Sequence, residues 1–187
     1  MNQRKFGIFL SYLNIMLHAF IGFLYVPILL HYIGKSEYGL YQLMGSLIAY
    51  FSIMDFGLTA AVIRFYTKYK ALNNQKGMEN ILALSLRGYG IVTILVLGIG
   101  VFCYSFLDQA FAVSMTASEL AEAKYIFLLL LLNIVITLST VVFRAVINAH
   151  EKFLFLKGLE TFQLVSQPIL VILVLKHYPS AFSVAAV

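Results

Sequence analysis

Charged side chains inside long apolar runs are the residues of this 187-residue sequence with the clearest potential for chemistry. Arg64, Arg87 and Arg144 lie within roughly two helical turns of the basic ends of their apolar runs. A guanidinium binds phosphate through a planar, two-pronged set of donors, so converging arginines could hold an anionic headgroup. The general preference for basic residues at the cytoplasmic ends of spans explains the same positions without a ligand. Arg144 is the strongest candidate, because it continues a polar stripe.

Asp55 places a carboxylate deep inside an apolar run, and an ionisable group at such a depth is a candidate functional site. Counted along ideal helices, Arg87 on the next, antiparallel run lies at a similar depth, so an Asp55–Arg87 ion pair is one prediction. The alternative is that Asp55 titrates or binds a cation during transport. The sequence leaves both roles, structural pair and ion coupling, open.

Polar residues in four of the apolar runs fall on one face each when spaced at helical periodicity. Polar groups avoid lipid, so these stripes are expected to contact one another or water. Interhelical hydrogen bonds, worth about 0.6 kcal/mol each, are the alternative to a solvated cavity. For His18 the alternative to a binding role is that of a hydrogen-bonding residue on the polar stripe of the first run. The predicted substrate-binding residues are Arg144, Arg64, Arg87, Asn133, Thr137, Asn14, His18, Gln163 and Gln167.

The overall composition is that of a membrane protein. The chain is 61% hydrophobic and 11% charged, with a mean hydropathy of +0.91, whereas soluble domains are about 25% charged. Its one cysteine, Cys103, excludes an internal disulfide and a cysteine-based metal cluster. The basic residues do not gather on a soluble domain, which argues against nucleic-acid binding. No catalytic or nucleotide-binding motif is complete, so we expect neither an enzyme nor a cofactor.

The apolar runs predict an all-α, polytopic transmembrane bundle with five complete spans and the start of a sixth. Gly34 is expected to end the first helix in a left-handed cap, and Pro27 to kink it. Thr116 and Glu119 have the spacing of a capping box before the fourth helix. The predicted spans are 6–33, 40–65, 81–107, 125–147 and 153–175, followed by an incomplete span at 181–187.

The distribution of lysine and arginine predicts the orientation. With the N-terminus inside, ten basic residues fall at cytoplasmic ends and three, Lys35, Lys124 and Lys176, at the outer ends. This favours a cytoplasmic N-terminus in a multi-pass plasma-membrane protein. The last apolar run stops after seven residues, so we expect a chain truncated in its sixth span, a short hydrophobic tail being the alternative.

Three stretches resemble one family. They are I-G-K-S-E-Y-G-L-Y-Q-L at 33–43, M-D-F-G-L-T-A-A-V-I-R-F-Y at 54–66 and F-R-A-V-I-N-A-H-E-K-F at 143–153. They resemble polysaccharide-biosynthesis flippases, the O-antigen flippase-like branch of the multidrug/oligosaccharidyl-lipid/polysaccharide exporter superfamily. The resemblance implies that residues 1–187 are the N-terminal lobe of a two-lobed transporter. It also implies movement of polyprenyl-diphosphate-linked oligosaccharide across the cytoplasmic membrane for surface polysaccharides such as lipopolysaccharide. The implied partners are the lipid bilayer, the lipid-linked oligosaccharide, and a C-terminal lobe or a second copy.

Two alternative functions remain. A cation-coupled multidrug exporter of the same superfamily is expected to carry more buried carboxylates than Asp55 alone. A non-transporting membrane scaffold, or a truncated remnant, would use the polar stripes only for helix packing.

Overall fold

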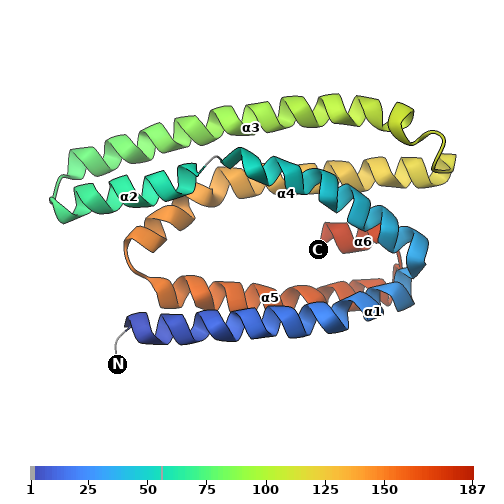
Figure 1. The fold of residues 1–187 in the computed structure, drawn as a ribbon, viewed down its shortest axis with the longest axis horizontal. Coiled ribbons are helices and arrows are strands. Elements are labelled where there is room, and N and C mark those ends of the chain that lie inside the picture. Colours follow the sequence, from blue (N-terminus) through green and yellow to red (C-terminus); the bar gives the residue numbers. More distant parts are fainter. Residues whose placement is uncertain (1–2, 56) are drawn as a thin grey trace.

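The computed structural model describes residues 3–55 and 57–187, which form helices joined by short turns (Figure 1). No strand occurs in these ranges, so the all-α prediction is confirmed for them. The long apolar runs allow little else, since backbone polar groups in lipid must be satisfied within the segment. The elements are α1 (Gln3–Phe51), a 3₁₀ turn η1 (Ser52–Asp55), α2 (Leu58–Ala71), α3 (Gln75–Phe111), α4 (Ala117–Ala149), α5 (Phe153–Leu175) and α6 (Ala181–Ala186).

Gly34 divides α1 into two legs, residues 3–33 and residues 35–51. Its φ of 77° and ψ of 174° are not helical, and a positive φ is cheap only for glycine. Figure 1 shows the chain turning back at this point, so that the first leg lies beside α5 and the second leg lies near α4. The predicted break is confirmed, although the ψ angle is extended rather than that of a left-handed helical cap. Pro27 lies within the helical part of the first leg.

Four segments are long and apolar enough to cross a membrane, by length and composition. The first, Leu10–Ala71, has 62 residues, about three times the length that one crossing needs. α6 has six residues and is too short to span. The described chain is therefore consistent with a multi-pass membrane protein, and five spans plus a sixth stays a prediction. The other segments are Gln75–Phe111, Ala117–Ala149 and Phe153–Leu175.

A second break interrupts the predicted span at 40–65. The helix ends at Phe51, the 3₁₀ turn η1 follows, and α2 begins at Leu58. Gly57 has φ 75° and ψ 13°, the left-handed helical conformation that costs other residues energy. A continuous helix over 40–65 is therefore wrong, and Asp55 lies at the break rather than on a regular helical face.

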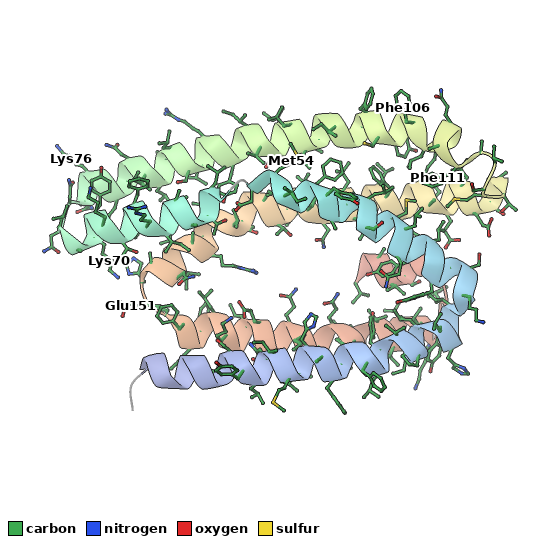
Figure 2. All side chains as sticks on the ribbon, viewed as in Figure 1. Met54, Lys70, Lys76, Phe106, Phe111 and Glu151 are labelled. Atoms are coloured by element: carbon green, nitrogen blue, oxygen red, sulfur yellow. The ribbon has the colours of Figure 1, made fainter. Side chains whose placement is uncertain are left out.

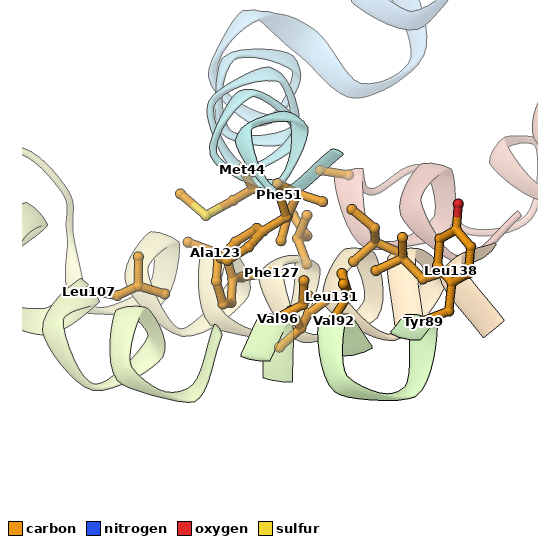
Figure 3. Close-up of a cluster of buried hydrophobic side chains, with 14 of the residues drawn as sticks. Met44, Phe51, Tyr89, Val92, Val96, Leu107, Ala123, Phe127, Leu131 and Leu138 are labelled. Atoms are coloured by element: carbon orange, nitrogen blue, oxygen red, sulfur yellow. The ribbon is translucent and has the colours of Figure 1, made fainter. Parts of the chain in front are cut away.

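Two apolar clusters hold the helices together. The larger joins α3 and α4 to the second leg of α1, with Met44, Val96 and Phe127 fully buried (Figure 3). Gly100 on α3 lets α4 approach closely, because a Cβ there would lie 2.6 Å from both Cδ atoms of Leu131. The smaller cluster joins the first leg of α1 to α5 and α6 through Leu29, Ile33, Val171, Leu175 and Val184.

The turns gather at two opposite ends of the bundle. At one end, Lys70 Nζ donates to the Ala149 carbonyl at 3.2 Å, which ties the α2–α3 turn to the α4–α5 turn. At the other, Ser36 Oγ donates to Glu119 Oε1 at 3.0 Å, and the Ala181 N–H donates to Glu37 Oε2 at 2.7 Å. The N-terminus lies at the first end (Figure 1). The N-terminus and these turns thus lie at the ends to which the ten-to-three count assigns them (Figure 1), and the orientation itself stays a prediction.

The predicted capping box at the start of α4 is confirmed. The Thr116 N–H donates to Glu119 Oε2 at 2.9 Å, and Thr116 Oγ1 accepts from the Glu119 N–H at 3.4 Å. These bonds satisfy donors that a helix N-terminus leaves unpaired. Because Glu119 also accepts from Ser36, the cap additionally links α4 to the break in α1.

Candidate functional site

A polar cavity of about 360 Å³ lies where α4, α5, α6 and the second leg of α1 meet. Three of the predicted substrate-binding residues line it: Asn133 from α4, and Gln163 and Gln167 from α5. The structure therefore brings together the polar stripes of α4 and α5, although α4 packs mainly on α3 and α5 packs mainly on α1. The remaining lining residues are Tyr41, Leu130, Ser166, Leu170, Val184, Ala185 and Val187.

The face of α4 that carries Asn133 continues beyond the cavity. Thr137 and Arg144 lie on the same face by helical spacing, and Arg144 is eleven residues, or about 16 Å, from Asn133. All three side chains are exposed, whereas the opposite face is buried through Leu138 and Val142. Figure 2 shows side chains of α4 and α5 projecting toward the space between the two helix groups. The polar face of α4 is thus not used to pack the described helices.

Asn14 takes part in packing rather than in the cavity. Its Oδ1 accepts from Thr161 Oγ1 at 2.6 Å, and its Nδ2 donates to the Lys157 carbonyl at 3.4 Å. These bonds join the first leg of α1 to α5, as the interhelical alternative predicts. His18, one turn further along α1, is exposed. Neither residue lines the cavity.

The three candidate arginines do not converge. Arg64, Arg87 and Arg144 are exposed and lie on three different helices, α2, α3 and α4. Arg87 lies about 200° around α3 from Tyr89, whose side chain faces α2, so Arg87 points away from α2. Of the three, only Arg144 lies on the polar face of α4 that leads to the cavity.

Asp55 forms a compact oxygen cluster with Thr59 and Tyr89. Its Oδ1 accepts from Tyr89 Oη at 2.5 Å and from Thr59 Oγ1 at 2.9 Å. The two hydroxyl oxygens are themselves 2.7 Å apart. Tyr89 is 2% exposed and Asp55 is half-buried. The cluster joins the helix break to α3.

The predicted Asp55–Arg87 ion pair is wrong: no such pair forms among the described residues. The residue count along the helices predicts the depth of the partner of Asp55 well, because the observed partner, Tyr89, is two residues from Arg87. The residue count does not show which side of α3 faces Asp55. Tyr89 shares a face with the buried residues Val92 and Val96, so its position on the apolar stripe of α3 was the available signal.

No group of histidine, cysteine, aspartate and glutamate side chains among the described residues could hold a metal ion. The fold and cavity define a helical protein with several segments able to cross a membrane and a polar space between its helices. The chain matches no family model, no curated protein and no solved structure. The resemblance to polysaccharide flippases stays a prediction.

Proposed function

We propose that this chain is a lobe of a membrane flippase that moves polyprenyl-diphosphate-linked oligosaccharide across the cytoplasmic membrane. The observation that carries the proposal is the cavity lined by Asn133, Gln163 and Gln167. Each of these amides offers both donors and acceptors, the combination that sugar hydroxyls require. These three amides are exposed, so they do not serve to pack the described helices. A polar cargo explains amides around a cavity in an otherwise apolar bundle better than helix packing does.

Arg144 is proposed to bind the diphosphate. It is exposed on the same face of α4 as Asn133, about 16 Å nearer the end that carries most of the basic residues. A guanidinium can hold two phosphate oxygens at once, and a charge-assisted bond of this kind is stronger than a neutral one. The headgroup would then meet Arg144 first and the amides of the cavity afterwards.

The polyprenyl tail is proposed to stay in lipid beside α4. Leu132 is 55% exposed and Ile136 is 56% exposed, and both flank the polar face of the helix. A cargo can therefore keep its apolar chain against these side chains while its polar part follows Asn133 and Thr137. In this proposal the exposed polar face of α4 is covered by a second lobe or a second copy of the chain, in a plasma membrane with the N-terminus inside.

Glycan export in the native host tests the proposal. A strain lacking the gene is complemented with a Gln163→Leu, Gln167→Leu double variant, which keeps side-chain size and removes the amides. We expect loss of surface glycan and accumulation of lipid-linked oligosaccharide on the cytoplasmic side, with normal protein in the membrane. The matched control is Gln75→Leu, an exposed glutamine in the α2–α3 hairpin, remote from the cavity. Export by the double variant at the control's level would contradict the proposal.

A further inference from the structure

Tyr41 gives the polar cavity an aromatic side chain that the amide contacts of the proposed cargo leave unused. It lies on the second leg of α1, is half-buried, and packs against both apolar clusters. It lines the cavity together with Gln163 and Gln167. We propose that the cavity binds a single sugar ring of the cargo, with the ring of Tyr41 as the surface on which that sugar stacks. The inference rests on the proposed function and names the part of the cargo that this cavity recognises.

The size of the cavity matches one sugar residue rather than a whole oligosaccharide. Its volume of about 360 Å³ is that of about a dozen water molecules, at roughly 30 Å³ each. A hexose residue has about as many heavy atoms as a dozen waters, and its covalent bonds hold them closer together than water molecules lie. One sugar ring therefore fits with some water, and the rest of the glycan must lie outside the cavity.

The lining of the cavity has a polar part and an apolar part, as a sugar ring does. Gln163 and Gln167 are one helical turn apart on α5, so their Cβ atoms are about 5–6 Å from each other, close to the width of one sugar ring. Their amides can therefore meet hydroxyls on two sides of the same ring. Leu130, Leu170 and Val184 supply apolar side chains, against which the C–H groups of a ring face can pack.

An aromatic ring adds an attraction that aliphatic side chains do not provide. The C–H groups of a sugar carry partial positive charge, because each carbon is bonded to oxygen, and the face of an aromatic ring carries partial negative charge. Among the described residues that line the cavity, Tyr41 is the aromatic one. Its contacts with both apolar clusters hold the side chain in place before a ligand arrives, which lowers the entropy lost on binding.

A structural role in the apolar clusters is the alternative for Tyr41, and Tyr38 provides the matched control. Tyr38 lies three residues earlier on the same leg of α1, is also half-buried, and packs against the smaller cluster. It does not line the cavity, and its hydroxyl accepts from Gln42 Nε2 at 2.6 Å. A change that acts through packing should affect both tyrosines, whereas a sugar in the cavity should affect Tyr41 alone.

Tryptophan fluorescence of the full chain in lipid nanodiscs tests the proposal. The sequence contains no tryptophan, so Tyr41→Trp and Tyr38→Trp each introduce a single fluorophore and keep an aromatic ring. The probe is the glycan that mild acid releases from the lipid-linked oligosaccharide of the native host. We expect a saturable change in emission for Tyr41→Trp and none for Tyr38→Trp. In equilibrium dialysis Tyr41→Leu should bind the probe about 2- to 10-fold more weakly than Tyr41→Phe, the size of an aromatic contact.

No saturable change in Tyr41→Trp, or an equal change in Tyr38→Trp, would overturn the proposal. Glycan export separates this result from a failure of the proposed function. If the Gln163→Leu, Gln167→Leu double variant loses export while Tyr41→Leu exports as well as Tyr38→Leu, the inference about Tyr41 is wrong and the proposed function stands. If the double variant exports normally, the proposed function itself is contradicted, and the inference falls with it.

Discussion

Two glycines on α3, two residues apart, should respond in opposite directions to the same substitution. A Cβ at Gly100 would lie 2.6 Å from both Cδ atoms of Leu131, and Leu131 is 4% exposed, so neither methyl has free space. A Cβ at Gly98 would meet nothing within 4 Å. Alanine gains up to about 1 kcal/mol over glycine in a helix at either position, but forced overpacking costs about 1–3 kcal/mol. The gain is common to both variants and cancels in their comparison.

We therefore expect Gly98→Ala to match or exceed the stability of the wild type. Gly100→Ala should lie about 1–3 kcal/mol below Gly98→Ala. Reversible unfolding in mixed micelles measures this difference, with helicity as the signal. In a double-mutant cycle, Leu131→Ala should cost less in the Gly100→Ala background than alone, because the smaller side chain makes room for the new methyl. Equal stability of the two glycine variants would refute the close approach of α3 and α4 at Gly100 and Leu131.

Three further predictions concern the orientation, the cargo and a helix cap. For the orientation, a thiol is placed in the α2–α3 turn (Leu72→Cys) or in the α3–α4 turn (Ser114→Cys) of a Cys103→Ser background. In whole cells a membrane-impermeant thiol reagent should label Ser114→Cys and not Leu72→Cys. The reverse pattern would overturn a cytoplasmic N-terminus. Arg144→Ala should abolish glycan export while Arg144→Lys, which keeps the charge without the two-pronged geometry, should be intermediate; full export with alanine would exclude a diphosphate contact there. Thr116→Ala should lower stability by about 1 kcal/mol in micelle unfolding, because it removes the N-cap of α4, and an unchanged stability would show that the cap contributes nothing.

Features that depend on a few neighbouring residues could be predicted from the sequence. The break at Gly34 and the capping box of Thr116 and Glu119 follow from local backbone and side-chain chemistry. The helical class and the grouping of turns at two ends follow from the lengths of the apolar runs and the positions of basic residues. The same lengths could not show that the second predicted span is interrupted, because the apolar run continues on both sides of the interruption at Ser52–Asp55.

Features that depend on how helices are rotated against one another could be predicted only in part. Helical spacing correctly put Asn133 on an unpacked face of α4, and put Gln163 and Gln167 together on α5. It could not show which helix each stripe faces, so Asn14 was assigned to the cargo although it hydrogen-bonds to α5. The partner of Asp55 could not be predicted for the same reason. Counting residues gives the depth of a side chain along its helix, but it does not give the rotation of α3 relative to Asp55.

The central claim, that α4 and α5 enclose a polar space open to water, is tested most directly by thiol accessibility in the membrane. Asn133→Cys and Gln167→Cys place thiols in the cavity, and Ile94→Cys places one on α3 at a 70% exposed apolar position expected to face lipid. A small hydrophilic thiol reagent reacts only where water reaches the sulfur, because the thiolate is the nucleophile. In the Cys103→Ser background, we predict that both cavity thiols react and the thiol at position 94 does not. Cavity thiols as unreactive as the one at position 94 would contradict the claim.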